Sequence, residues 1–201
     1  MSDGEPLTGE PLALDLVNTR PTGPDGHPAD LIDTPRRLAA WLDLEADRLP
    51  ADLTRTAPSA DDLAAVRAVR GHIEAILRAV TEGNAPPPSA LRALTEAQRL
   101  APAFRELAWD GAAVTAAPRR TGPLGVRLAA LLAESAADLL TDPGIGKVRQ
   151  CEAEDCVLLF LPAHPRRRWC SAARCGNRAR VARYYRRHKP NAVNSETEMG
   201  S

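Results

Sequence analysis

The feature that most constrains the fold of this chain is the placement of its four cysteines. Cys151, Cys156, Cys170 and Cys175 form two pairs, with four residues inside each pair and thirteen residues between the pairs. Two close pairs divided by a loop are typical of a structural zinc site, in which two turns each supply two thiolates. Two disulfides or four unrelated core thiols are the alternatives. We favour one structural Zn²⁺ ion because this segment has too few large apolar side chains to fold without a crosslink.

The zinc site predicts a small module over residues 147–189. A chain reversal is expected at each cysteine pair, with residues 157–160 as a strand leaving the first pair and a helix starting at the second. Such a module would be treble-clef-like. Four cysteines complete a tetrahedral shell, whereas a catalytic zinc keeps an open position for water, so we expect a structural role. His164 in the connecting loop is an alternative ligand, although an exposed or DNA-facing imidazole is the favoured interpretation.

The formal net charge of zero conceals a split along the chain. Residues 1–146 hold 14 arginines against 21 acidic residues, which gives a net charge of −7. Residues 147–189 hold 12 basic and 3 acidic residues, which gives a net charge of +9. Concentrated positive charge on a short module is typical of a protein that binds a polyanion. The alternative is a solvated face, or a contact between the acidic and the basic part.

Two groups of arginines carry most of this positive charge. One group precedes Trp169, and the other lies on a helix expected after the last cysteine, which Asn177 would cap. On that helix we expect Val181 with Tyr184 or Tyr185 to pack inward. The planar guanidinium binds phosphates and guanine edges, so we favour nucleic acid as the ligand over a merely solvated helix. The candidate nucleic-acid-binding residues are Arg166, Arg167, Arg168, Arg178, Arg180, Arg183, Arg186 and Arg187.

The first 146 residues predict a mainly α-helical domain. Hydrophobic residues make up 44% of the chain but aromatic residues only 3%, which favours helices packed through aliphatic side chains. The expected helices cover about residues 34–49, 59–83, 89–100 and 124–141, with Ser59 and Ser89 as helix caps. The dipeptide Asp110-Gly111 predicts a small β-hairpin over residues 104–117, although its alanines have weak strand propensity.

Three polar residues accompany a short apolar run at residues 12–17. Asp15, Asn18 and Thr19 are candidates for a pocket that binds a small effector, or for caps that terminate a buried element. We favour the structural interpretation because short polar side chains commonly bond to nearby backbone groups. By analogy with regulators that join an effector-binding domain to a DNA-binding domain, residues 1–146 are also a candidate dimerisation domain. A homodimer is therefore one form that we consider.

The residues around the second cysteine pair resemble a known family. The sequences WCS at residues 169–171 and CGNR at residues 175–178 are similar to the signature of bacterial CGNR zinc-finger proteins. Residues 12–19 and 30–42 resemble the N-terminal ABATE domain of that family. The resemblance implies a stress-induced transcription regulator with the same four cysteines as zinc ligands. The chain departs from the family pattern at residues 161–165, so the resemblance implies no role in recognition for that loop.

DNA is therefore the expected partner of the basic module, with the N-terminal domain sensing a small effector. RNA is an alternative because Trp169 and the tyrosines could stack on bases, and an acidic protein is a further alternative. We do not expect an enzyme, because the sequence lacks a Gly-rich phosphate loop, a G-x-S-x-G elbow and an H-E-x-x-H pair.

The location of the protein is expected to be cytoplasmic. No apolar run approaches the roughly 20 residues that span a bilayer, so no membrane contact is expected. The first residues are acidic, where a signal peptide would be basic and then hydrophobic. A reducing cytoplasm disfavours stable disulfides, which is consistent with zinc-bound cysteines. Residues 190–201 lack a hydrophobic pattern and are expected to be disordered.

Overall fold

A computed structural model of the chain describes residues 6–22, 27 and 29–188, over which the protein is mainly helical, as predicted. The helices and helical turns are α1 (Leu12–Val17), α2 (Pro35–Leu44), η1 (Ala46–Arg48), α3 (Ala51–Thr54), α4 (Ala60–Thr81), α5 (Pro88–Leu100), α6 (Leu124–Thr141), η2 (Ile145–Lys147), η3 (Ala172–Gly176) and α7 (Asn177–His188). The strands are β1 (Phe104–Trp109), β2 (Val114–Arg119), β3 (Arg149–Gln150) and β4 (Leu159–Phe160). The predicted disordered tail, residues 190–201, lies outside the described residues.

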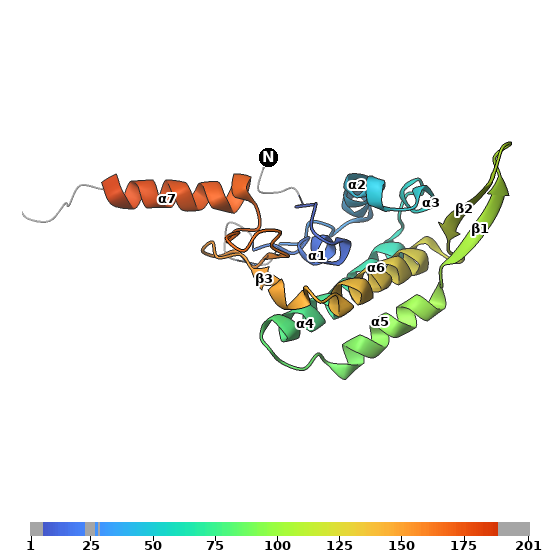
Figure 1. The fold of residues 1–201 in the computed structure, drawn as a ribbon, viewed down its shortest axis with the longest axis horizontal. Helices are drawn as coiled ribbons and strands as arrows, with labels where there is room; N and C mark the ends of the chain where they lie inside the picture. The colour runs from blue at the N-terminus through green and yellow to red at the C-terminus, as the bar shows by residue number, and fades with distance from the viewer. Residues whose placement is uncertain (1–5, 23–26, 28, 189–201) are drawn as a thin grey trace, which may run out of the picture.

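The core is built from the three longest helices, α4, α5 and α6, which lie side by side (Figure 1). Apolar residues recur at three- and four-residue steps on α4, and the buried positions include Ile73 and Leu77. Leu128 of α6 is fully buried in the same cluster. The short helix α1 packs on both α4 and α6, and every one of its residues is buried. The aliphatic packing expected from the low aromatic content is therefore what forms the core.

The start of α4 follows the predicted capping box. The Ser59 hydroxyl accepts a hydrogen bond from the Asp62 N–H at 3.2 Å, and the Asp62 carboxylate accepts one from the Ser59 N–H at 2.8 Å. The same carboxylate accepts a hydrogen bond from the Gly125 N–H of α6 at 2.5 Å. A Cβ atom at Gly125 would lie 2.7 Å from the Asp62 Cα atom, so only glycine allows the two helices to approach this closely.

The start of α5 differs from its prediction. Pro87 occupies the N-cap position and Pro88 the first helical position, and no side chain caps the helix. The expectation that Ser89 caps this helix is therefore wrong. Proline has the backbone dihedral of a helix and no N–H to satisfy, so it begins the first turn without a polar cap.

The predicted β-hairpin is confirmed by β1 and β2, which pair antiparallel over their whole length. In the turn the Asp110 carboxylate accepts hydrogen bonds from the N–H groups of Ala112 and Ala113, at 2.8 and 2.9 Å. Gly111 has a φ of 103°, which favours glycine. The hairpin projects from one end of the molecule (Figure 1), and every residue of its two strands except Arg119 is exposed.

The C-terminal segment packs on the helical domain at the end opposite the hairpin, and α7 extends away from both (Figure 1). Val148 and Leu159 of this segment belong to the same hydrophobic cluster as the helices. A second cluster surrounds the cysteines and includes the fully buried Phe160. Within the described residues, no helix has the length and the apolar character needed to cross a membrane.

Candidate metal centre and basic surface

The four cysteines form one buried cluster, as their spacing predicts. Their Sγ atoms lie within 4.8 Å of one another, with separations of 3.9 Å for Cys156–Cys170 and 3.6 Å for Cys170–Cys175. Thiolates about 2.3 Å from a tetrahedral zinc lie about 3.8 Å apart, so the cluster fits one structural zinc ion. The alternative ligand His164 is exposed and does not belong to this cluster. The four cysteines are free thiols rather than disulfides.

The first cysteine pair lies at the end of a short β-ribbon. β3 pairs with β4 antiparallel, and the Cys151 N–H donates to the Leu158 carbonyl at 2.9 Å. Asp155, directly before Cys156, has a φ of 61° and reverses the chain there. The strand is shorter than the predicted span of residues 157–160, because β4 covers only Leu159–Phe160.

The second cysteine pair lies at the start of a helical segment. The Ser171 hydroxyl accepts a hydrogen bond from the Arg174 N–H at 3.3 Å, and η3 then leads directly into α7. Asn177 is therefore inside a continuous helical segment, and the expectation that it caps α7 is wrong. The cap comes earlier because the turn that holds the second cysteine pair is itself helical. The Asn177 carboxamide instead accepts a hydrogen bond from Arg180 at 2.6 Å.

Besides one another, the sulfurs of Cys151 and Cys175 contact nitrogen donors. The Cys170 N–H donates to the Cys151 sulfur at 3.3 Å, and the Arg178 guanidinium lies 3.5 Å from the Cys175 sulfur. Zinc binds cysteine in its deprotonated form, so these donors suit a zinc–thiolate centre.

Glu10 and Asn18 of the helical domain hold the zinc module in place. The Asn18 side chain donates to the Leu159 carbonyl at 2.8 Å and accepts from the Leu159 N–H at 2.9 Å. The Glu10 carboxylate accepts hydrogen bonds from the Leu161 N–H at 2.9 Å and from Arg167 at 2.6 Å. Sequence reasoning missed Glu10. Its partners, Leu161 and Arg167, lie 151 and 157 positions further along the chain, and contacts over such distances leave no local signal in the sequence.

Arg167, a predicted nucleic-acid-binding residue, points into this junction instead. Besides Glu10, its guanidinium donates to the Cys170 carbonyl at 2.6 Å and lies 4.5 Å from the centroid of the Phe160 ring. The buried acceptors and the ring hold the side chain against the module. We therefore count Arg167 as part of the junction and not of the exposed basic surface.

Asp15 and Thr19 are also engaged within the helical domain. The buried Asp15 carboxylate accepts hydrogen bonds from two N–H groups of the preceding loop and from Arg48. Burial raises the pKa of Asp15 to about 7, although the hydrogen bond from Arg48 acts in the opposite direction. The Thr19 hydroxyl accepts a hydrogen bond from Arg70 at 2.8 Å. All three predicted pocket residues, Asn18 included, thus make hydrogen bonds within the chain.

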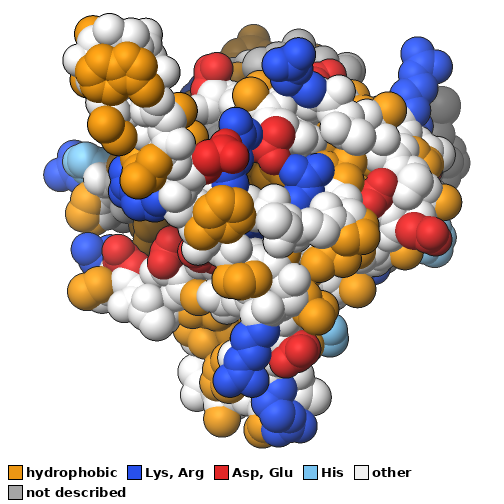
Figure 2. Space-filling view, turned by 90° about the vertical axis from the view of Figure 1, so that its right-hand side faces the viewer, with side chains coloured by type: hydrophobic (Ala, Val, Ile, Leu, Met, Phe, Trp, Pro, Cys, Tyr) orange, Lys and Arg blue, Asp and Glu red, His pale blue; other side chains and the backbone are white. Residues whose placement is uncertain are grey.

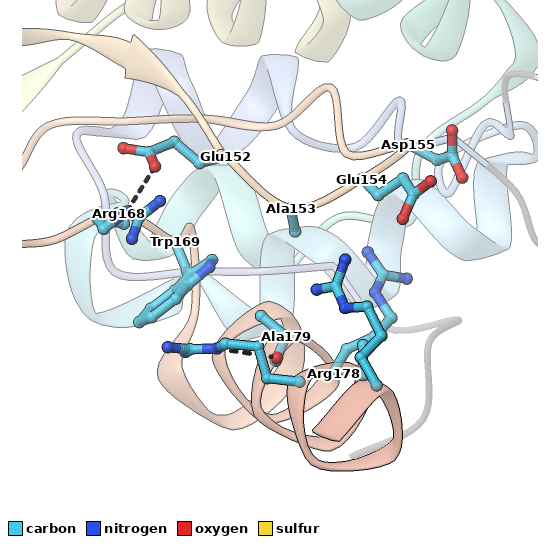
Figure 3. A pocket seen from close by; sticks show the side chains of 11 residues that line it. Glu152, Ala153, Glu154, Asp155, Arg168, Trp169, Arg178 and Ala179 are labelled. Atoms are coloured by element: carbon cyan, nitrogen blue, oxygen red, sulfur yellow. Dashed lines mark hydrogen bonds and ion pairs between the residues drawn. The ribbon is translucent and has the colours of Figure 1, made fainter. Parts of the chain in front are cut away.

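A cleft of about 450 Å³ separates α7 from the first zinc turn (Figure 3). Trp169 lies in this cleft, with the guanidinium of Arg168 at 5.8 Å and that of Arg183 at 5.9 Å from its ring centroid. Arg168 also pairs with the Glu152 carboxylate at 2.5 Å. The acidic residues of the cleft are Glu152, Glu154 and Asp155, and its arginines are Arg168, Arg178, Arg183 and Arg186. The cleft therefore brings both signs of charge together.

The adjoining side of α7, which we call the outer face, is basic and aromatic. It is defined by Arg180, Arg183, Tyr184, Arg187 and His188, which line a shallow depression of about 350 Å³. Arg183 lies at the edge of this face, because its side chain also lines the cleft. The Tyr184 and His188 rings are stacked with centroids 4.1 Å apart. In contrast to the cleft, no acidic residue among those that the structure describes lines this depression.

The exposure of α7 corrects the expected packing of its apolar residues. Val181 is 53% exposed, Tyr184 60% and Tyr185 68%, so none of them packs inward. No residue of the helix is buried, because no other element of the described structure lies over it. Arg166, in the connecting loop, is exposed as well. The aromatic residues that were assigned to a core are therefore available to a ligand.

The fold and the metal centre together define a helical-domain protein with a four-cysteine zinc finger. Two family models match the chain: ABATE, described as "Putative stress-induced transcription regulator", over residues 10–143, and a CGNR zinc finger over residues 147–188. The chain therefore belongs to the ABATE family and carries a CGNR zinc finger, as the resemblance predicted. Both families are of regulatory or zinc-finger type rather than enzyme families. No curated protein matches the chain.

Proposed function

We propose that the protein is a transcription regulator that binds DNA through the outer face of α7. The observation that carries this proposal is the set of exposed arginines on that face. Within the described residues, Arg180, Arg183 and Arg187 form no ion pair with a carboxylate, whereas Arg167 and Arg168 of the same module do. Unpaired, exposed arginines on one side of a helix are the electrostatic footprint of a nucleic-acid-binding element.

The shape of α7 supports the proposal. The helix has 12 residues, none of them buried, and it extends away from the rest of the molecule (Figure 1). The major groove of DNA is about 12 Å wide and admits an α-helix. A helix that projects freely can enter this groove without a clash between the helical domain and the phosphate backbone.

The acidic wall of the cleft supports the choice of the outer face. Glu154 and Asp155 lie across the cleft from the arginines on the inner side of α7. Carboxylates repel phosphates, so a duplex that approached this side would meet an unfavourable field. In the described part of the chain, no carboxylate lines the outer face. Arg187 lies on this face, whereas the neighbouring Arg186 lines the cleft.

The proposal is tested with the full-length, zinc-loaded protein by selecting bound sequences from a random duplex pool at physiological salt. Affinity for a selected duplex is then measured at several salt concentrations. Arg187→Ala should weaken binding several-fold and reduce the salt slope by about 0.9, the value for one lost phosphate contact. Arg186→Ala is the matched control, because it removes the same charge at the neighbouring position on the cleft side and should change binding less.

Two results would overturn this proposal. An equal or larger effect of Arg186→Ala would show that the cleft side contacts the nucleic acid. Selection that yields no enriched sequence, with weak retention of every duplex, would exclude a sequence-specific regulator. Competition with structured RNA identifies an RNA-binding protein if RNA displaces DNA at lower concentration.

The helical domain contacts the zinc module through Asn18 and Glu10. Because Asp15, Asn18 and Thr19 already bond within the chain, we infer that they do not contact an effector directly and that Asn18 sets the position of the module. An effector that acts on the helical domain would then change the orientation of α7 through the Asn18 and Glu10 junction.

A further inference from the structure

The β1–β2 hairpin has one apolar and one polar face. Side chains alternate between the faces of a strand, and residues paired across the strands share a face. The register pairs Leu107 with Ala116 and Trp109 with Val114, so these four side chains lie on one face. The apolar face, as we call it, comprises Arg105, Leu107, Trp109, Val114, Ala116 and Pro118. The opposite face carries the ion pair of Glu106 with Arg119, at 2.7 Å.

The apolar face is not covered by the described part of the chain. Leu107 is 69% exposed, Trp109 66% and Val114 68%. The two strands pack extensively only on each other, and the main tie to the helices is the pair of Arg119 with Asp52 at 3.3 Å, at the base of the hairpin. An isolated two-stranded hairpin is marginally stable in water, and contiguous exposed apolar patches mark interaction sites. The apolar face of the hairpin is therefore a candidate interaction surface.

We propose that the apolar face of the hairpin packs against the same face of a second copy of this chain. The face is self-complementary, because it carries no acidic residue and its single charge, Arg105, lies at the end opposite Trp109. We place the two-fold axis in the plane of the interface and perpendicular to the strands, so that the two hairpins lie antiparallel and Trp109 lies over the partner's Arg105 and Pro118. The indole then covers a guanidinium and an apolar ring, while Leu107 and Ala116 meet their counterparts near the axis.

The size of the face is sufficient for such a dimer. Strands of six residues are about 20 Å long, and two of them side by side are about 10 Å wide. Each face then covers about 200 Å² in projection, and with a protruding tryptophan that alone can bury roughly 150–250 Å², two such faces would bury on the order of 600–1,000 Å², the range of a weak, reversible interface. Figure 2 views the molecule from the hairpin end and shows hydrophobic side chains exposed on this side.

The dimer would separate the two DNA-binding helices. The hairpin and α7 lie at opposite ends of the molecule (Figure 1), so a two-fold axis through the hairpins places the zinc modules at the two far ends of the dimer. Each α7 would then bind a separate segment of nucleic acid, and not the adjacent half-sites of one palindrome. Self-association itself is measured without DNA, so it succeeds or fails independently of the proposed function.

The test is the oligomeric state of the full-length protein, measured by sedimentation equilibrium and light scattering at about 1–100 μM. The wild-type protein should be a dimer. Leu107→Glu buries a charge in the interface and should make the protein monomeric, with an unchanged circular dichroism spectrum. Ala108→Glu is the matched control, because it introduces the same residue at the next position but on the opposite face, and it should remain dimeric.

A second pair of variants locates the contact without relying on the loss of a dimer. Ala116→Cys lies near the proposed axis and should form an intermolecular disulfide on mild oxidation of the zinc-loaded protein. Ala117→Cys, on the opposite face, should form far less. A monomeric wild-type protein throughout the concentration range would overturn the proposal. So would a dimer that survives Leu107→Glu, or equal crosslinking of the two cysteine variants.

Discussion

Arginine has different roles in the two regions of the molecule. In the helical domain Arg70 is 3% exposed, and its guanidinium binds both carboxylate oxygens of Asp30, at 2.8 and 2.6 Å. In α7, Arg180 and Arg187 are exposed, and within the described residues neither forms an ion pair. The same residue type thus completes a buried network in one region and is available to a ligand in the other. Position in the fold, and not the count of basic residues, decides which arginines can bind nucleic acid.

The two regions also differ in what stabilises them. The helical domain buries a continuous aliphatic cluster, whereas the zinc module has a small cluster around its cysteines and an exposed helix. Burial of apolar side chains should therefore stabilise the helical domain, and the bound metal should stabilise the zinc module. Four experiments test this difference, beginning with the one that should have the largest effect.

Cys170→Ser should abolish zinc binding and unfold the zinc module, α7 included, while the helices of the N-terminal domain stay folded. Zinc contributes about 10–16 kcal/mol to the folding of comparable modules, and three thiolates leave the shell open. Zinc content and amide hydrogen exchange would report both effects, with exchange expected to rise over β3, β4 and α7. The exposed Ala173→Ser is the control and should retain one zinc ion. Slow exchange in the metal-free variant would show that the module folds without zinc.

Leu128→Ala should have the converse effect, with loss of stability in the helices and retention of zinc. Leu128 is fully buried in the helical cluster, so removal of its side chain should lower the free energy of unfolding by about 2–5 kcal/mol. Chemical denaturation followed by circular dichroism measures the change. Leu100→Ala, at a position that is 62% exposed, should change stability by about 0.5 kcal/mol or less. Loss of zinc from the Leu128 variant would indicate that the two regions unfold together.

Asn18→Ala should loosen the junction between the two regions. The substitution leaves the N–H and carbonyl of Leu159 without their partners, at a cost of about 1–3 kcal/mol. We expect zinc to remain bound, and the unfolding of the two regions to separate into two transitions in calorimetry. Asn84→Ala, which removes an exposed carboxamide, serves as the control. A single transition at the wild-type temperature would contradict a role of Asn18 in the junction.

Asp15→Asn should change the pH dependence of stability. Because the folded-state pKa of Asp15 is about 7 and the unfolded value about 3.9, the folded state binds the proton more tightly between these limits. The free energy of unfolding therefore falls as pH rises from about 4 to 7, by up to about 1.4 kcal/mol per pH unit. The variant should lack this contribution. Urea denaturation of both zinc-loaded proteins at several pH values measures the difference, and parallel curves would contradict it.

The parts of the fold that sequence predicts are those determined by neighbouring residues. The capping box at Ser59 and the turn at Asp110-Gly111 each depend on a few consecutive positions, and the cysteine spacing depends on one short stretch of chain; each is confirmed in the structure. The hairpin formed in spite of its alanines because the turn determines the register. In α7 the apolar pattern predicted a buried side, but packing depends on a neighbouring element, and none covers this helix.

The parts that sequence did not predict depend on distant partners. Arg167 resembles its neighbours along the chain, but it points into the junction, where its partners include Glu10, 157 positions away. The three polar residues near the N-terminus were recognised as unusual, but their partners were not, because they come from η1, α4 and β4. Local patterns show which residues are candidates, and tertiary contacts decide which of them face a ligand.

The pair of hydrogen bonds between Asn18 and Leu159 has a consequence for how this protein can be divided. The Asn18 carboxamide bonds to both the N–H and the carbonyl of Leu159, as the backbone of a neighbouring strand would. It therefore satisfies the hydrogen-bonding groups at the open edge of β4. A zinc finger produced by itself would expose that edge together with Val148 and Leu159, and it should be prone to aggregate. Two separate family models match the chain, but its two regions share one hydrophobic cluster. Separating them would therefore expose apolar side chains of both regions to water.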